Sequence, residues 1–210
     1  MSLKRVAAAR KMPSQDRSSA TVDAMITATA HILATEGYNR ASTNRIAAAA
    51  GVSIGSLYQY FPNKDSLIAA LVERHATQML GQFESELASL SGMALEDAIP
   101  ELIRASVQTH GSQARLHRVL TRELPRGLTH RLEGATGIGA AMIRERLEGI
   151  RSEIRPKNLD LAVFIIVSAV SAVIHARVIE PPEKVDDEQL VRELSDLVLR
   201  YLIKIGEHRH

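Results

Sequence analysis

The chain has 210 residues, of which 45% are hydrophobic, only 3% are aromatic and none is Cys or Trp. This length allows one or two domains with a substantial hydrophobic core. The absence of Cys excludes disulfides and thiol catalysis. The scarcity of aromatic residues argues against an RNA or single-strand binder that stacks bases on rings. Ala, Leu, Ile, Arg and Glu dominate instead, which predicts an all-α fold.

The net charge of +2 is unevenly distributed along the chain. Residues 1–65 carry 8 Lys and Arg against 4 Asp and Glu, whereas residues 66–210 carry 18 against 20. A basic N-terminal part beside a mildly acidic remainder indicates that the N-terminal part meets a polyanion.

No segment of the sequence is expected to enter a membrane. The charged residues 1–17 are not followed by the apolar stretch of a signal peptide. The uncharged run between Asp160 and Arg177 has 16 residues, fewer than the roughly 20 that a membrane span needs, and it contains Ser and His. We therefore expect this run to be a buried helix and the protein to be cytoplasmic.

The first predicted elements are an arm and a long helix. Residues 1–17 are basic and lack hydrophobic periodicity, which predicts a disordered arm. Such an arm could enter the minor groove of DNA, but we favour a solubilising tail or an expression remnant. A helix is predicted from Ser18 or Ser19 to Glu36, with Gly37 as its C-terminal cap.

Two short helices joined by a glycine turn follow. Ser42 is an N-cap for the first, which ends at Gly51, and Ser53 is an N-cap for the second. Phe61 ends the second helix because the residue before a proline disfavours the helical state. Three helices in this order, with a Gly-containing turn, are typical of the helix-turn-helix DNA-binding motif. Helices this short need tertiary support, which we expect from Ile46, Ala47, Val52, Leu57 and Phe61 packing against the first helix.

The rest of the sequence is predicted to be helical, without a hairpin signal or an internal repeat. Gly and Pro residues interrupt it, and the helices are expected near residues 64–90, 94–110, 112–124, 128–150, 157–180 and 186–206. The predicted domains are therefore a helix-turn-helix domain over residues 18–65 and a larger helical domain over residues 66–210.

Residues 37–67 read GYNRASTNRIAAAAGVSIGSLYQYFPNKDSL, which closely resembles the DNA-binding signature of the tetracycline-repressor (TetR) family. The matching elements are Gly37-Tyr38, Ser42, Ile46-Ala47, Ala50-Gly51-Val52-Ser53, Gly55, Leu57-Tyr58, Tyr60-Phe61, Lys64 and Leu67. The resemblance implies a homodimeric regulator, more often a repressor than an activator, that binds a near-palindromic operator. It also implies that the C-terminal domain dimerises and binds a small-molecule effector.

The predicted DNA-binding residues have several roles. Side chains left on the outer face of the second short helix would read base edges: Ser53, Ile54, Ser56 and Gln59. The resemblance implies phosphate contacts for Thr43, Tyr58, Tyr60 and Lys64. Arg45 is a further candidate for a phosphate, Ser42 caps the preceding helix, and Gly55 would let the backbone approach DNA. Ile54 and Asn44-Arg45 depart from the commonest family pattern, which leaves the operator sequence open.

The resemblance assigns an effector pocket and a dimer interface to the larger domain. Candidate pocket residues are His110, His117, Arg122, Glu123, Met142, Phe164 and His175. Broad apolar helix faces with small residues that allow close approach suggest a dimer interface formed by Leu161, Ile165, Ser168, Ala172, Leu194, Leu197, Val198 and Tyr201. The low aromatic content favours an aliphatic or modestly polar effector over a large planar one.

Other functions are less well supported by the sequence. The histidines at 110, 117 and 175 could form a metal site with Glu123, but their spacing matches no metal motif, so no metal or cofactor is expected. The glycine-rich residues 134–140 follow no strand and lack the order of a nucleotide-binding loop. No catalytic motif predicts an enzyme. The remaining alternatives are a dimeric protein-interaction module without a small ligand, and an architectural DNA binder without sequence preference.

Overall fold

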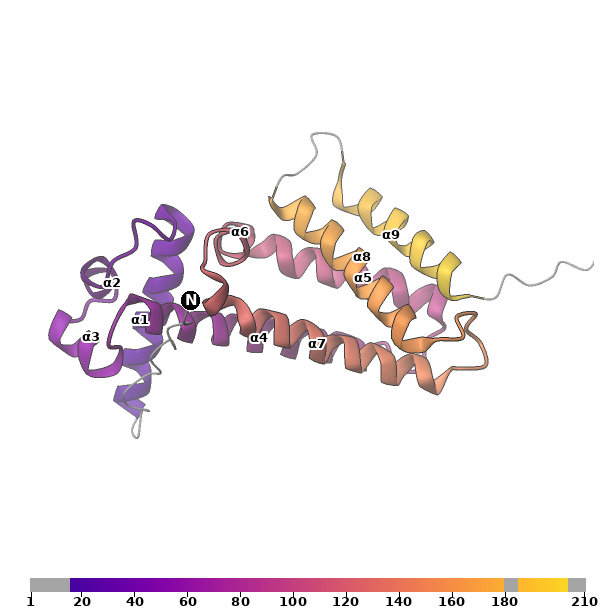
Figure 1. The fold of residues 1–210 in the computed structure, drawn as a ribbon, viewed down its shortest axis with the longest axis horizontal. Coiled ribbons are helices and arrows are strands. Elements are labelled where there is room, and N and C mark those ends of the chain that lie inside the picture. Colours follow the sequence, from indigo (N-terminus) through magenta and orange to yellow (C-terminus); the bar gives the residue numbers. More distant parts are fainter. Residues whose placement is uncertain (1–15, 180–184, 204–210) are drawn as a thin grey trace, which may run out of the picture. The chain divides into compact units, whose positions relative to one another are not determined.

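The computed structural model describes residues 16–179 and 185–203, so residues 1–15, most of the predicted arm, lie outside the described residues. Within these ranges the chain forms nine α-helices and no strand beyond one isolated bridge between Ile154 and Ile203 (Figure 1). The helices are α1 (Asp16–Glu36), α2 (Thr43–Ala49), α3 (Ile54–Tyr60), α4 (Lys64–Ser89), α5 (Leu95–Ser112), α6 (Ala114–Arg122), α7 (Arg126–Gly149), α8 (Leu159–Ile179) and α9 (Asp187–Leu202). The prediction of an all-α fold is confirmed, and the helices lie within a few residues of their predicted bounds.

The chain divides into two compact units that do not follow the predicted boundary at residue 65. We call residues 1–78 together with 115–134 the head unit, and residues 79–114 together with 135–210 the body unit. The first half of α4, all but the first residue of α6 and the start of α7 therefore belong to the head unit. The sequence did not predict this because α6 is separated from α1–α3 by two complete helices along the chain.

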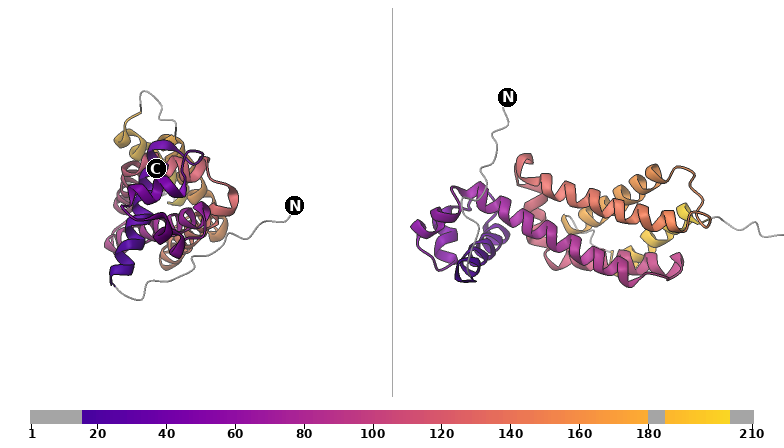
Figure 2. Two further views of the ribbon diagram at one scale, coloured as in Figure 1. Left: turned by 90° about the vertical axis from the view of Figure 1, so that its left-hand side faces the viewer. Right: turned by 90° about the horizontal axis from the view of Figure 1, so that it is seen from below.

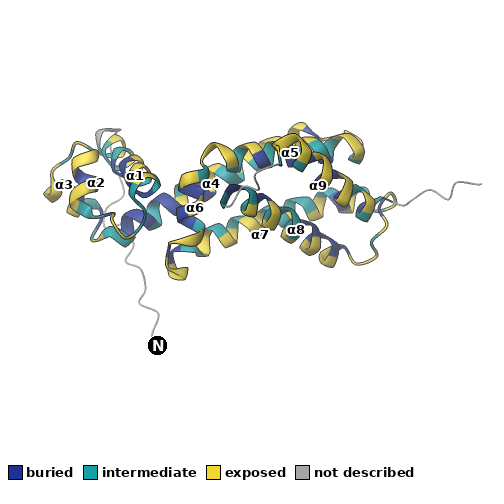
Figure 3. Ribbon diagram, turned by 90° about the horizontal axis from the view of Figure 1, so that it is seen from above, coloured by how far each residue is buried: buried dark blue, intermediate teal, exposed yellow. Residues whose placement is uncertain are grey.

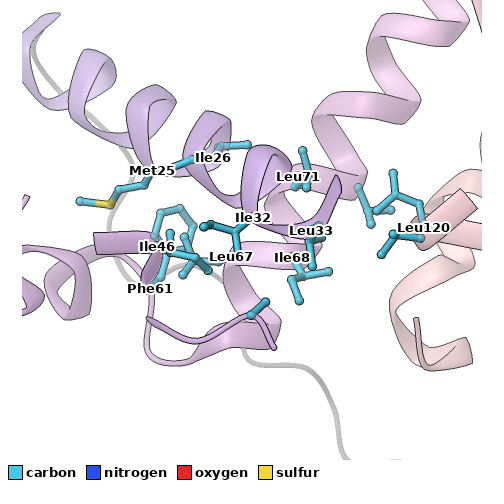
Figure 4. Packing of buried hydrophobic residues seen from close by; sticks show 14 of the residues in the cluster. Met25, Ile26, Ile32, Leu33, Ile46, Phe61, Leu67, Ile68, Leu71 and Leu120 are labelled. Atoms are coloured by element: carbon cyan, nitrogen blue, oxygen red, sulfur yellow. The ribbon is translucent and has the colours of Figure 1, made fainter. Parts of the chain in front are cut away.

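The head unit has a hydrophobic core to which both the helix-turn-helix motif and α6 contribute. The right-hand view of Figure 2 shows α1, α2 and α3, in indigo and purple, as one compact group. The fully buried side chains include Met25 and Leu33 of α1, Ile46 of α2 and Leu57 of α3. The core continues through α4, α6, the residues after α6 and the start of α7 with Leu67, Ile68, Leu71, Val72, Leu116, Val119, Leu120, Leu124 and Leu128 (Figure 4).

The local sequence explains where the short helices begin and end. The Ser42 hydroxyl accepts a hydrogen bond from the Arg45 amide, and the Ser53 hydroxyl accepts one from the Ser56 amide, so both predicted N-caps are confirmed. Gly37 and Gly51 have φ angles of 78° and 67°, which side chains with a Cβ rarely adopt. These two glycines end α1 and α2 and allow the sharp turns of the motif.

In the body unit, α5 packs against α8 and α9. Its core includes Ile103 and Val107 of α5, Val163 of α8 and Val191 of α9. The glycine-rich residues 134–140 lie inside α7. A Cβ on Gly139 would stand 3.6 Å from the Phe83 ring of α4, an ordinary van der Waals distance, so the packing here does not require glycine.

The sequence analysis expected α8 to be a buried helix, but much of it is exposed. It is long and apolar enough to cross a membrane by length and composition, yet only 28% of its most apolar window is buried within the chain (Figure 3). Ala162, Val163 and Ile166 face the core, whereas Leu161, Phe164 and Ile165 are 52%, 66% and 40% exposed. The expectation was wrong because α8 is apolar on every side, and composition alone does not reveal how many of its sides are covered.

Candidate nucleic-acid interface

The outer face of α3 is the most evident surface for contact with DNA. Leu57 of α3 is fully buried and orients the helix on the core. The opposite face leaves Ser53, Ile54, Gly55, Tyr58 and Gln59 exposed. An exposed helix face held to the core by a buried anchor is how a helix-turn-helix protein presents side chains to a major groove.

Contacts between α2 and α3 hold this face in place. The hydroxyls of Thr43 and Tyr58 lie 3.1 Å apart, so the start of α2 is linked to the middle of α3. The hydroxyls of Ser53 and Ser56 lie 2.8 Å apart. Ser53, which is predicted to read bases, therefore also caps α3, and whichever of the two hydroxyls accepts within this pair keeps its own O–H to donate to DNA.

Two predicted phosphate contacts are engaged within the protein. The Tyr60 hydroxyl lies 3.0 Å from the hydroxyl of Ser18 in α1. The Arg45 guanidinium forms an ion pair of 2.7 Å with Glu36 at the end of α1. A guanidinium has five donors, so Arg45 retains donors for a phosphate while it stabilises the packing of α2 against α1.

Lys64 at the first turn of α4 is held by Tyr38. Its Nζ donates a hydrogen bond of 3.1 Å to the Tyr38 carbonyl oxygen and lies 3.8 Å from the centre of the Tyr38 ring. The Tyr38 hydroxyl donates to the Asp65 carboxylate at 3.3 Å. Partial burial and the Asp65 carboxylate raise the pKa of the Tyr38 phenol, so this donor keeps its proton. An ammonium has three donors, and the Tyr38 carbonyl uses only one of them.

Comparison with known protein families agrees with this geometry. The family described as bacterial regulatory proteins, tetR family, matches residues 25–71, and the tetracyclin repressor-like C-terminal domain matches residues 94–202. The chain belongs to the TetR family. Proteins of this family are DNA-binding transcriptional regulators and not enzymes, so the resemblance seen in residues 37–67 extends to the whole fold.

Curated relatives of this TetR-family protein match only a short part of the chain. Nucleoid occlusion factor SlmA of Actinobacillus pleuropneumoniae is 46% identical over 46 residues, which cover 22% of this chain and 23% of that protein. The fatty acid metabolism regulator protein of Bacillus subtilis is 30% identical over 63 residues, 30% of this chain and 32% of that protein. The chain thus aligns with less than a third of the length of either relative.

Solved structures share the fold over most of the chain at low identity. A TetR-family regulator of Mesorhizobium loti has a TM-score of 0.71 at 19% identity and covers 90% of this chain and 100% of its own. FadR of Bacillus subtilis in complex with stearoyl-CoA has a TM-score of 0.69 at 21% identity, covering 84% and 96%. The SmeT–triclosan complex has a TM-score of 0.68 at 20% identity, covering 89% and 93%.

The residues predicted to line an effector pocket are distributed over both units. In the body unit the rings of His110 and His175 lie 5.4 Å apart, and burial lowers the pKa of both imidazoles. His117 is instead buried in the head unit, where its ring lies 6.0 Å from that of His75.

Three further pocket candidates lie at exposed positions or in the other unit. Phe164 is 66% exposed on the outer side of α8 and does not line an interior site. Arg122 and Glu123 belong to the head unit, and both are exposed. Met142 of α7 is half-buried in the body unit.

The predicted dimer residues fall into three groups by exposure. Leu161, Ile165, Ser168, Ala172 and Leu197 are exposed. Tyr201 is half-buried. Leu194 and Val198 are 4% and 3% exposed within the core of the body unit, where the inner side of α9 meets α5, so they are not available to a second chain.

Two residues of the head unit make contacts beside Lys64 that the sequence analysis did not predict. Tyr38 was recognised only as an element of the family signature, although its backbone and side chain contact Lys64 and Asp65. Glu123 was assigned to the pocket, although its carboxylate accepts a hydrogen bond from the Tyr38 amide at 3.0 Å. No sequence signal joins these two positions, which are 85 residues apart.

Proposed function

We propose that this protein is a homodimeric, sequence-specific repressor in the cytoplasm that a small-molecule effector releases from a near-palindromic operator. The observation that supports this proposal is that one chain has both an exposed polar face on α3 and an exposed apolar stripe on α8. The first fits a major groove, and the second fits another copy of the same stripe. A two-fold dimer would present two recognition helices to successive grooves, roughly 34–36 Å apart.

On DNA, the residues of the head unit would divide their roles. Ser53, Ile54, Ser56 and Gln59 would face base edges, where Gln suits adenine and Ile suits a thymine methyl group. Thr43, Arg45, Tyr58, Tyr60 and Lys64 would contact phosphates and set the register of the helix. Ile54 is exposed and offers DNA an apolar side chain instead of a charged one, so we expect a preference for thymine in at least one operator position.

The dimer would form through the outer stripe of α8. Leu161, Phe164, Ile165, Ser168, Ala172 and Val173 recur at helical spacing and are all exposed. An apolar stripe of this extent is uncommon on the surface of a monomer, and the small Ser168 and Ala172 at its centre would let two copies of α8 approach closely. Leu197 of α9 is 50% exposed and would extend the same interface.

The effector would bind in the body unit and is expected to have an aliphatic part. FadR of Bacillus subtilis was solved with stearoyl-CoA and SmeT with triclosan, so proteins of this fold accept both long-chain and aromatic ligands. The body unit has few aromatic side chains and an aliphatic core, which favours an acyl chain. His110 and His175 provide polar groups beside that core. The effector would lower operator affinity by the difference in its affinity for the two states of the dimer.

The test is a pull-down of sheared genomic DNA from the source organism at near-physiological salt, followed by sequencing. We expect a few sharp peaks that share a near-palindrome. Gln59→Ala should weaken or redistribute the peaks, whereas Gln82→Ala, at an exposed position of the body unit, serves as the matched control. Broad enrichment that falls steeply with salt would identify an architectural binder instead and overturn the proposal.

The effector is tested on the same operator. Stearoyl-CoA and triclosan are suitable probes, added separately to the wild-type protein in a thermal-shift and a gel-shift titration. We expect the acyl compound to raise the melting temperature and to release the operator. Release by triclosan alone would contradict the aliphatic effector, and release by neither would favour a protein-interaction module without a small ligand.

A further inference from the structure

We infer that Glu123 is a positioning residue for DNA binding, which acts through Tyr38 on the phosphate contact made by Lys64. This inference rests on the proposed function and assigns a part of the DNA-binding machinery to α6, outside the helix-turn-helix motif. It depends on contacts within the head unit alone.

The first step is that the end of α6 is firmly held against the head. Leu120 is fully buried and Leu124 is 8% exposed, and both belong to the hydrophobic core that contains the helix-turn-helix motif (Figure 4). Glu123 lies between these two anchors. Glu123 is exposed, but its backbone is fixed by its neighbours and by the hydrogen bond of its own amide to the Val119 carbonyl.

The second step is that the Glu123 carboxylate contacts the turn between α1 and α2. Its Oε2 accepts a hydrogen bond of 3.0 Å from the Tyr38 amide. Glycine at residue 37 leaves the carboxylate in this position: a Cβ there would lie 2.8 Å from the same oxygen and would displace it from the Tyr38 amide. The positive φ of Gly37 points the Tyr38 amide out of the turn, where Glu123 satisfies it.

The third step links Tyr38 to DNA. The backbone carbonyl of Tyr38 accepts a hydrogen bond from Lys64, its ring lies under the same ammonium, and its hydroxyl donates to Asp65. Tyr38 therefore holds the first two residues of α4 by three separate contacts. Because Lys64 lies in the first turn of α4, where free amides already favour an anion, its placement decides whether the ammonium reaches the phosphate.

Glu123 carries a negative charge that its hydrogen bond to the Tyr38 amide does not need. The charge lies in the unit that must approach a polyanion, so it opposes binding at long range. An amide side chain would satisfy the Tyr38 amide without this charge. Glu123→Gln should therefore bind DNA at least as tightly as the wild type, whereas Glu123→Ala should bind more weakly although it removes the same charge.

The experiment measures affinity for a duplex that the wild-type protein selects from a randomised library, over a series of salt concentrations. Neutralising one phosphate contributes about 0.9 to the slope of log affinity against log salt, so Lys64→Met should lower the slope by about that amount. Glu123→Ala should lower the slope similarly and weaken binding about threefold to tenfold. Glu123→Gln should retain the wild-type slope, and Glu133→Gln, at an exposed carboxylate of the same unit, controls for charge.

A double-mutant cycle provides a second measurement, which can still be interpreted if Glu123→Ala also lowers the stability of the folded protein. Gly37→Ala should impair binding more in the wild type than in the Glu123→Ala background, because only the wild type has the collision between the new Cβ and the carboxylate. An unchanged slope for Glu123→Ala, or additive effects in the cycle, would overturn the inference even if Lys64→Met lowers the slope. An unchanged slope for Lys64→Met would also overturn the inference. The proposed sequence-specific DNA binding is judged separately, by whether the wild-type protein selects a specific duplex from the library, and it can hold when the inference about Glu123 fails.

Discussion

The head unit and the body unit are both built from amphipathic helices, but they differ in which surfaces they leave uncovered. The head closes its core on itself, and its prominent exposed apolar side chains, Ile54 at 38% and Tyr58 at 45%, lie on the face of α3. The body leaves an entire stripe of α8 exposed, with Phe164 at 66%. A surface for a polar ligand such as DNA needs few apolar residues, whereas a surface for a second protein chain needs many.

The difference also lies in how each unit is assembled along the chain. The head combines α1–α3 with the first half of α4 and with α6, which follows α5 of the body. Short helices such as α2 and α3 bury too little surface to be stable alone, and the leucines of α6 supply part of what they lack. The family's helix-turn-helix segment is therefore a recognisable sequence unit but not a complete structural one.

The largest expected effect concerns the α8 stripe. Leu161→Asp combined with Phe164→Asp places two charges where we propose that two chains meet, and we expect the protein to become a monomer. Losing the second recognition helix should weaken operator binding by about 10²–10⁴-fold, because the second contact is no longer intramolecular. Light scattering on a sizing column and gel-shift titration measure the two effects.

The matched control is Ile138→Asp, which replaces another exposed apolar residue of the body. Ile138 lies on α7 and is 50% exposed. The control variant should leave the mass of the particle unchanged. A dimer that persists in the double variant would remove α8 from the interface and leave the exposed stripe to another partner.

The next largest effect tests whether α6 belongs to the head. Leu120→Ala removes a fully buried side chain, which should cost about 2–5 kcal/mol in the free energy of unfolding. Because Leu120 packs in the core of the head, hydrogen exchange should increase in α1–α4 more than in α5, α8 and α9. Ile138→Ala, at a position that is 50% exposed in the body and outside the proposed dimer interface, is the control. Equal loss of protection in both units would show that the two cores are not separable.

A smaller effect is expected for Tyr58→Phe. The substitution removes only the hydroxyl that lies 3.1 Å from Thr43 and that we assign to a phosphate. The loss of one such hydrogen bond should weaken binding by about 1 kcal/mol for specific and random duplexes alike. A gel-shift titration with both duplexes distinguishes this from a loss of specificity, and unchanged affinity for both would contradict the phosphate role.

The smallest effect concerns the pH dependence of the body unit. Burial lowers the pKa of His110 and His175 in the folded protein, and the charge of His110 lowers that of His175 further. The unfolded chain then binds more protons, so the two groups favour folding above a pH of about 6.5 and lose that contribution as the pH falls through this value toward the lower folded pKa. His110→Gln with His175→Gln should therefore lose less stability on acidification than the wild type.

Urea unfolding at several pH values measures this dependence. His31→Gln, at an exposed position of α1, controls for the loss of an imidazole. The same acid destabilisation in the double variant and in the wild type would mean that other groups account for it.

Much of the fold and part of the site were predictable from residues close in sequence. Ser42 and Ser53 cap their helices within three residues, Gly51 turns the chain at a single position, and Phe61 ends α3 because Pro62 follows. The buried set of the helix-turn-helix motif was also predictable, since Ile46 and Leu57 have a helical period that leaves the polar residues on the other side.

The sequence by itself determined the helices, their ends and the DNA-binding signature, because capping, turn formation and hydrophobic period act over a few residues. Only the tertiary structure decided which residues distant in sequence share a core. It placed α6 in the head, turned Phe164 outward, and joined Glu123 to Tyr38 across 85 residues. Such pairings depend on how whole helix faces pack together, and a side chain's sequence neighbours do not specify them.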